Sequence, residues 1–198
     1  MQIKRGRKRD DSVRVSILTA MLSLVEEGTS FARINVEQLA RQAGVSKTTI
    51  YKWWPGKEDI FCEAFLRHAS EALPILGYDA GNQHDFYAQF LGRIIEMRAF
   101  HRTAVARVMT GLALEHPQIA HQLNEKHQQP RFQAMRTIFE TWFLERASKD
   151  DITFFLEMSF SLIYNFSATT RDEDVVSLIR RLFRTVFPHY AELDLNHP

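Results

Sequence analysis

One stretch, from Asn35 to Lys57, constrains the fold more than any other part of the chain. It reads NVEQLARQAGVSKTTIYKWWPGK and holds two short segments joined by Gly44. Asn35 and Ser46 precede the two segments, and both residue types accept hydrogen bonds from the first amides of a helix. A Pro-Gly pair ends the second segment. The stretch therefore predicts two short helices around a tight turn, a helix-turn-helix whose second helix enters the major groove of DNA.

The spacing of apolar residues predicts which side of each helix packs inward. In the first helix, four apolar residues recur at i, i+3, i+4 and i+7 and share one face: Val36, Leu39, Ala40 and Ala43. In the second helix, Ile50 and Trp54 stand four apart and are expected to face inward together. Its outward residues can donate to phosphates and base edges: Lys47, Thr48, Tyr51 and Lys52. The alternative is a helical hairpin whose polar face only meets water.

Composition and charge are those of an ordinary globular protein with one basic end. The 198 residues are 45% apolar and 25% charged, enough for one domain or two small ones. Residues 1–60 hold 11 Lys and Arg against 7 Asp and Glu, whereas the rest holds 14 against 17. The basic excess around the helix-turn-helix fits a surface that meets phosphate.

The sequence indicates a cytoplasmic protein with no membrane partner. No apolar run reaches the roughly 18 to 20 residues of a membrane span. The basic N-terminus is followed by no apolar segment, so we expect no secretory signal. The single cysteine, Cys62, excludes an intrachain disulfide and is expected to be a small core residue.

The first ten residues carry a cluster of basic side chains with no apolar pattern. Two interpretations are open: a solvated tail, or an arm in which Arg5 and Arg7 follow the DNA backbone or enter the minor groove. The first helix is expected to begin at Asp11 and to stop at Gly28, which takes a left-handed conformation without strain.

The chain beyond the helix-turn-helix reads as helical throughout, which makes the fold class all-α. Pro55-Gly56 ends the second helix of the motif, and Lys57 begins a helix that closes at Leu73-Pro74. Residues 77–83 are the best linker, since they hold two glycines and no periodicity. Pro130 is expected to kink or restart one of the later helices. The later helices are expected at residues 84–100, 102–115, 119–145, 151–169 and 173–187.

Residues 11–60 resemble the DNA-binding domain of the tetracycline-repressor (TetR) family of bacterial transcriptional regulators. The residues that carry the likeness are Gly28, Phe31, Val36, Leu39, Ala40, Ala43-Gly44-Val45-Ser46, Thr49-Ile50-Tyr51, Trp54 and Lys57-Glu58. Two positions depart from the family pattern. Asn35 replaces the usual threonine and preserves the cap, whereas Trp54 replaces a phenylalanine and needs extra room.

The resemblance implies four parts and a set of DNA contacts. The parts are a basic arm (1–10), a helix-turn-helix DNA-binding domain (11–56), a connecting helix (57–76) and a helical regulatory and dimerisation domain (77–198). The residues that would meet base edges or phosphates of double-stranded DNA are Asn35, Ser46, Lys47, Thr48, Thr49, Tyr51, Lys52, Trp53 and Lys57, with Arg5 and Arg7 of the arm.

The resemblance also implies a homodimer on a palindromic operator and a small-molecule effector, with no cofactor. Aromatic and methionine side chains that would line a largely apolar ligand pocket are Phe90, Met97, Phe100, Met109, Trp142, Phe155 and Met158. The last two expected helices are apolar on more than one face, and the side chains that would form the dimer interface are Phe160, Ile163, Tyr164, Ile179, Leu182 and Phe183. For any one of these residues, ordinary helical core is the alternative.

Enzymatic and metal-binding functions find no support in the sequence. His116, His121 and His127 lie five and six residues apart, which does not place them on one helix face, so no metal site is expected. No phosphate loop, nucleophile elbow or paired catalytic set is present. The sequence therefore predicts a transcriptional regulator, a repressor released by a ligand. An activator or ligand-independent regulator of the same fold is the alternative, and a helical scaffold or enzyme without DNA binding is a more distant one.

Overall fold

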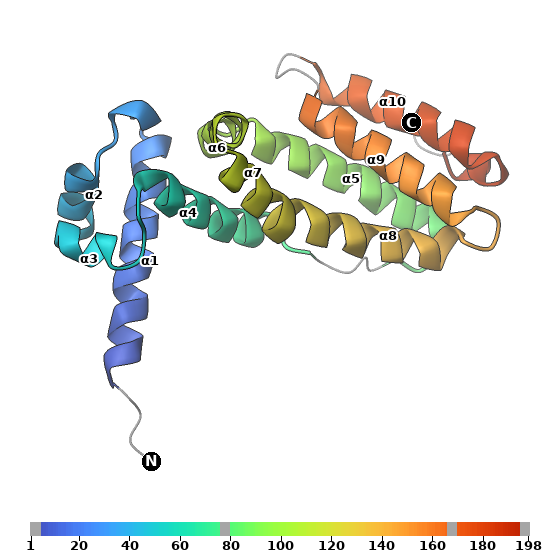
Figure 1. Cartoon of the computed structure of the whole chain (residues 1–198). Coiled ribbons are helices and arrows are strands. Elements are labelled where there is room, and N and C mark those ends of the chain that lie inside the picture. Colours follow the sequence, from blue (N-terminus) through green and yellow to red (C-terminus); the bar gives the residue numbers. More distant parts are fainter. Residues whose placement is uncertain (1–4, 76–79, 166–169, 195–198) are drawn as a thin grey trace. The chain divides into compact units, whose positions relative to one another are not determined.

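The computed structural model describes residues 5–75, 80–165 and 170–194, apart from the side chains of residues 5–9, 165 and 194. Within these ranges every regular element is a helix, which confirms the expected all-α class (Figure 1). The helices form two compact units. Unit 1 comprises residues 1–72 and 103–127, and unit 2 comprises residues 73–102 and 128–198.

Unit 1 contains the N-terminal helices and two helices from the middle of the chain. Its elements are α1 (Arg5–Glu26), η1 (Phe31–Arg33), α2 (Val36–Ala43), α3 (Lys47–Tyr51), α4 (Lys57–Ala72), α6 (Ala104–Glu115) and α7 (Pro117–Leu123). Helix α1 packs against α2, α4 and α6. Apolar side chains spaced along one face of α1, such as Ile17 and Met21, are fully buried there with Leu39 of α2 and Phe61 of α4. This shared core fixes the position of α2 and α3.

Unit 2 is a bundle built around aromatic side chains. Its elements are α5 (Gln83–His101), α8 (Gln129–Phe143), α9 (Lys149–Asn165), α10 (Asp172–Val186) and η3 (Pro188–Asp194), and the four α-helices lie side by side (Figure 1). At the centre the ring centroids of Tyr87 and Phe183 are 4.1 Å apart, and those of Phe90 and Phe139 are 4.9 Å apart. Such close aromatic pairs contribute beyond the area that they bury.

Two expected helix boundaries are wrong. Helix α1 begins at Arg5, six residues before Asp11, because the intervening Arg, Lys and Asp residues continue a helix without needing a cap. The single helix expected at residues 119–145 is three segments: α7, a π-helical turn (Asn124–Gln128) and α8. Pro130 lies in the first turn of α8, where its missing amide costs little, so the helix restarts there as the sequence indicated.

Candidate nucleic-acid interface

Helix α2 is fixed at both ends by the residues that the sequence nominated. The Oδ1 atom of Asn35 accepts a hydrogen bond of 2.8 Å from the backbone N–H of Gln38. At the other end Gly44 has φ +68°, and the N–H of Val45 reaches back to the carbonyl of Ala40 at 2.9 Å. This closure of the last turn needs a left-handed residue, so glycine at position 44 sets the angle at which the chain leaves α2.

Helix α3 begins at once with a second cap. The N–H of Thr49 donates to Ser46 Oγ at 3.1 Å, and the hydroxyls of Ser46 and Thr49 are 2.9 Å apart and share a hydrogen bond. Ile50 is fully buried and holds the inner side of the helix. The caps and the inward Ile50 confirm the predicted helix-turn-helix geometry and leave one face of α3 to solvent.

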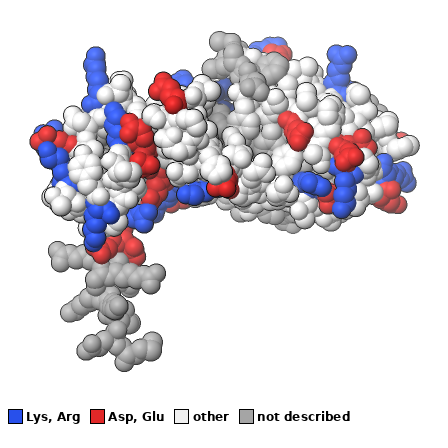
Figure 2. Space-filling model, in the orientation of Figure 1, with Lys and Arg blue, Asp and Glu red and all other residues white. Residues whose placement is uncertain are grey.

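The outward face of α3 carries four exposed side chains: Lys47, Thr48, Tyr51 and Lys52. More than half of the Tyr51 side chain is exposed, although aromatic residues in folded proteins are usually more buried. Lys47 Nζ lies 3.6 Å from Glu37, and Lys52 Nζ lies 3.9 Å from Asp10. Exposed ion pairs of this length contribute little, so both ammonium groups can exchange a carboxylate for a phosphate. Acidic and basic side chains are interspersed over the visible surface rather than segregated (Figure 2).

Comparisons with known proteins agree with this geometry. The model of the family "bacterial regulatory proteins, tetR family" matches residues 20–64, which span the helix-turn-helix. The chain is 30% identical over 165 residues to the HTH-type transcriptional regulator YdeS of Bacillus subtilis, covering 83% of this chain and 80% of YdeS. This chain belongs to the tetR family. It is therefore a DNA-binding transcriptional regulator, from a family of regulators rather than enzymes.

Solved structures of regulators share the fold of this tetR-family protein at low sequence identity. A TetR transcriptional regulator from Rhodococcus sp. RHA1 aligns with a TM-score of 0.59 at 16% identity, covering 96% of this chain and all of that one. The flavonoid-responsive regulator FrrA aligns with a TM-score of 0.60 at 20% identity, covering 90% of this chain and 97% of FrrA.

A three-residue cluster that the sequence reasoning missed fixes the end of the recognition helix. The indole N–H of Trp54, whose side chain is almost fully buried, donates to Glu63 Oε2 of α4 at 2.9 Å. Arg14 of α1 pairs with the same oxygen at 2.6 Å, and its guanidinium carbon lies 5.5 Å from the Trp54 ring centroid. Glu63 thus ties the chain after α3 to two other helices. A signal for it existed, since a buried tryptophan needs an acceptor.

Lys57 has a different role from the phosphate contact that the resemblance implied. Its Nζ donates to the carbonyls of Phe31, Ala32 and Ile34 at 2.9, 3.2 and 3.0 Å. It also lies 4.8 Å from the centroid of the Phe31 ring. Because the ammonium donates to three carbonyls, it ties η1 to the start of α4, and a phosphate would have to replace one of these bonds.

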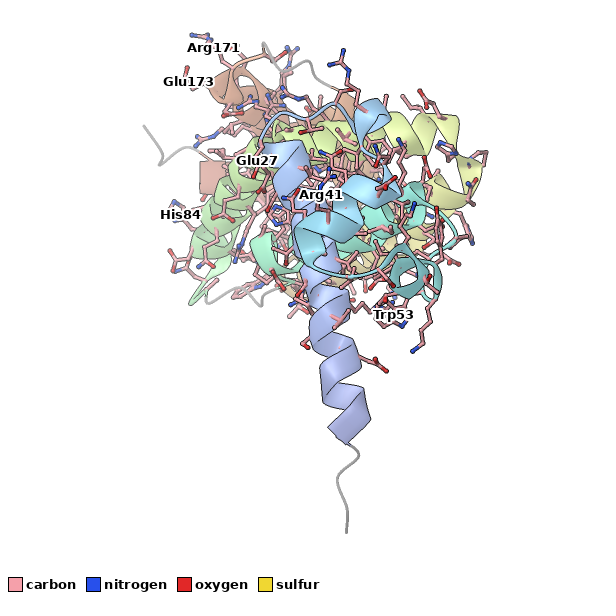
Figure 3. The ribbon with its side chains drawn as sticks, turned by 90° about the vertical axis from the view of Figure 1, so that its left-hand side faces the viewer. Glu27, Arg41, Trp53, His84, Arg171 and Glu173 are labelled. Carbon is pink, nitrogen blue, oxygen red and sulfur yellow. The ribbon has the colours of Figure 1, made fainter. Side chains whose placement is uncertain are left out.

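Three further basic residues concern the DNA surface. Arg41, which the sequence reasoning omitted, is exposed on α2 one turn after Glu37, the partner of Lys47, so it borders the same surface (Figure 3). The side chains of Arg5 and Arg7 lie outside the described residues.

Trp53, also marked in Figure 3, is half-buried beside α3, and Lys52 Nζ lies 5.6 Å from its ring centroid.

The residues expected at the dimer interface have different exposures. Ile163, Ile179 and Phe183 are buried in the core of unit 2, whereas Phe160, Tyr164 and Leu182 are only partly buried. Half of the expected set therefore lies on the inner face of these helices. The apolar side chains that α9 and α10 leave exposed are Phe154, Met158 and Leu178.

The residues expected to line a ligand pocket lie in several places. Phe90 and Phe155 pack ring against ring in the core of unit 2 with centroids 5.7 Å apart, and Trp142 stacks on Phe86. Met158 is exposed, and Met109 is buried in unit 1. Phe100 is buried, whereas Met97 lines a cavity of unit 2 together with Phe160, a residue expected at the dimer interface.

The described residues form neither a metal centre nor a membrane-spanning helix. No three His, Cys, Asp or Glu side chains come together there as metal ligands. None of the helices in that part of the chain combines the length and apolar content that a bilayer crossing needs.

Proposed function

We propose that this regulator is a repressor that binds a palindromic operator as a homodimer and leaves it when a small, largely apolar ligand binds unit 2. The observation that carries the proposal is the exposed polar face of α3, held outward by two capped helix ends and the buried Ile50. A helix held in this way can enter the major groove without rearrangement.

The proposed contacts divide into those that read sequence and those that position the helix. Lys47, Thr48, Tyr51 and Lys52 would meet base edges, because all four are exposed on one side of α3. Backbone phosphates would be met by the residues around the helix ends and in the arm: Asn35, Ser46, Thr49, Trp53, Arg5 and Arg7. Asn35 and Ser46 serve first as caps, so their contribution is to orient helix N-termini, which favour anions.

For the dimer, we propose the outer side of α9 and α10 as the interface. Phe154, Met158 and Leu178 are 50, 41 and 39% exposed, which is a large apolar surface for two adjacent helices. Phe154 and Met158 are one turn apart on α9, so they form a continuous stripe. Pairing with a second copy would bury them in a four-helix bundle, and the two recognition helices would then meet half-sites about one helical turn apart.

Support for ligand control comes from unit 2 and from a structural neighbour. Unit 2 contains a cavity lined mainly by apolar side chains, of the kind that binds small molecules. The structural neighbour FrrA is named as flavonoid-responsive, so a small-molecule response exists on this fold in that protein. A ligand that prefers one of two conformations is sufficient to release DNA. An activator, or a regulator that needs no ligand, would use the same DNA surface.

The test is selection of duplexes from a pool with a randomised centre, followed by gel shift with the recovered sequence. The proposal predicts inverted repeats, bound by the wild type and much more weakly by Lys47→Ala and Tyr51→Ala. Arg67→Ala is the matched control, because Arg67 is an exposed cation on α4 that pairs with Glu71. Failure to enrich any inverted repeat, or wild-type affinity in both α3 variants, would contradict the proposal.

A further inference from the structure

A cavity of about 60 Å³ lies within unit 2, among α5, α8, α9 and the chain that leads out of α4. Flexible or branched apolar side chains form most of its wall, including Met97, Met135, Ile138 and Phe160. Ile75, which also lines it, is 52% exposed and so marks the side that is open to solvent. The cavity is thus an apolar space with access from outside.

Two cations stand in this apolar wall, and one of them, Arg93 of α5, is paired with Glu96 at 2.9 Å. Arg131 of α8 lines the cavity, and its Nη2 donates to the carbonyl of Leu73 at 2.7 Å. That bond holds the guanidinium at the cavity edge. Burial lowers the pKa of Arg131, although a guanidinium stays charged at any physiological pH. Arg131 therefore holds a positive charge against a wall that, apart from the paired Arg93, is apolar.

Two neutral polar groups stand beside this charge. His101 follows Met97 by one turn on α5, and Tyr164 follows Phe160 by one turn on α9. Their ring centroids are 4.6 Å apart in an edge-to-face arrangement. Burial lowers the pKa of His101 to about 4, with Arg131 contributing, and burial raises the pKa of Tyr164 to about 12. Imidazole and phenol are therefore both neutral near pH 7.

His101 also has an unmet hydrogen-bonding requirement. Its Nε2 atom is buried and finds no hydrogen-bond partner among the residues that the structure describes. Buried polar atoms are almost always paired. His101 interacts with Arg131, which lines the cavity, so a ligand atom bound at Arg131 could supply the missing partner. A neutral imidazole with its proton on Nε2 can donate to an oxygen placed there.

We propose that the ligand of unit 2 is an amphipathic organic acid, with its carboxylate at Arg131 and its apolar chain among Met97, Met135, Ile138 and Phe160. His101 donates to the same carboxylate, and the Tyr164 hydroxyl lies beside it. The inference rests on the proposed function, because it names the class of ligand that would release the DNA. A carboxylate gains a charge-assisted bond from the guanidinium that a neutral alcohol of equal length cannot make.

The cavity must enlarge to hold such a molecule, and its wall is built to allow this. A space of about 60 Å³ accommodates only a few non-hydrogen atoms. Met97 and Met135 have unbranched side chains with three rotatable bonds, so they can move aside without backbone change. The acid therefore fills space that the two methionines vacate.

The test compares each acid with its matched alcohol. Octanoate and decanoate, with 1-octanol and 1-decanol, are titrated into the full-length protein at pH 7.5 by calorimetry and thermal shift. The acids are expected to bind at least about tenfold more tightly than the alcohols of equal length. Equal binding of acid and alcohol, or no binding of either acid up to its solubility limit, would overturn the proposal.

Variants assign the preference to the named residues. Arg131→Gln should remove the preference for acid while alcohol binding is kept, and Arg131→Lys should retain part of it. Arg136→Gln, on the same helix but paired with Glu140, is the matched control and should keep the full preference. If Arg131→Gln does not fold, His101→Phe gives a second test, since it should weaken acid binding several-fold. An unchanged preference in Arg131→Gln, or in both Arg131→Lys and His101→Phe, contradicts the assignment.

DNA release is measured separately with the selected duplex. Acid binding without release would refute ligand control of DNA binding but leave the ligand class intact. Sequence-specific DNA binding with no acid binding would refute the ligand class and leave the DNA-binding function intact.

Discussion

Removing the Glu63 carboxylate should weaken both unit 1 and DNA binding, although Glu63 lies outside the recognition helix. Glu63→Ala leaves the buried indole N–H of Trp54 without its acceptor and Arg14 without its ion-pair partner. Only 3% of Trp54 is exposed, so its indole is largely shielded from the water that would otherwise replace this bond. The chain after α3 would then lose its tie to α4 and α1.

The magnitude follows from the two interactions. A buried donor left unpaired costs about 1–3 kcal/mol. The pair with Arg14 is part-exposed on both sides, so it adds only about 0.2–1 kcal/mol. We therefore expect Glu63→Ala to lower the free energy of unfolding by about 1–4 kcal/mol. Glu63→Gln keeps an acceptor for the indole and should cost about 1 kcal/mol.

Urea unfolding followed by circular dichroism, at fixed protein concentration, measures these differences. Glu71→Ala is the matched control, since Glu71 is a solvent-exposed partner of Arg67 on the same helix, and it should cost less than about 0.5 kcal/mol. In a Trp54→Phe background the indole donor is absent, so the effect of Glu63→Ala should fall to about 1 kcal/mol. Equal destabilisation by Glu63→Ala and Glu71→Ala would refute the proposed tie.

Three further predictions concern other parts of the chain. Gly44→Ala should lower the free energy of unfolding by about 1 kcal/mol in urea, because φ +68° is strained for alanine. No atom would clash with the new Cβ, so backbone strain is the only expected cause. Unchanged stability would contradict the role of the turn. Asp172 bonds to Arg102 and to buried Arg98, and these bonds lower its pKa below 3.8. Its stabilisation is therefore present above about pH 4 and is lost as pH falls through the folded-state pKa. Asp172→Asn should be about 1–3 kcal/mol less stable at pH 7, with the gap to wild type closing in acid; a gap independent of pH would argue against this linkage. Met158→Glu with Leu178→Glu should convert a sedimenting dimer into a folded monomer, whereas an unchanged dimer would move the interface elsewhere.

The sequence predicted best where the physics is local. The caps at Asn35 and Ser46 and the glycine at position 44 each act within four residues, and all three lie where the pattern indicated. Pro130 likewise marked a helix restart, because a missing amide acts on its own turn. The all-α class followed from periodicity along the whole chain.

Contacts between distant residues were less predictable. Arg14 and Glu63 are 49 positions apart, and nothing in their local pattern pairs them. The resemblance implied a phosphate contact for Lys57. Its three carbonyl partners lie 23 to 26 residues earlier, so no local pattern pointed to them. Helix α10 has apolar residues on two faces, and their spacing alone does not show which face packs inside unit 2. Ile179 and Phe183, which were expected at the dimer interface, are buried in that unit.

The most direct test of the central claim is the salt dependence of binding to the selected duplex. If α3 carries the DNA surface, Lys47→Ala should bind the duplex less tightly. If Lys47 neutralises a phosphate, the magnitude of the slope of log K against log salt concentration should fall by about 0.9. If Lys47 reads a base instead, the slope should stay equal and the base preference should relax. Arg67→Ala should match the wild type in affinity and slope. Wild-type affinity, slope and base preference in Lys47→Ala would contradict the claim that this face of α3 meets DNA.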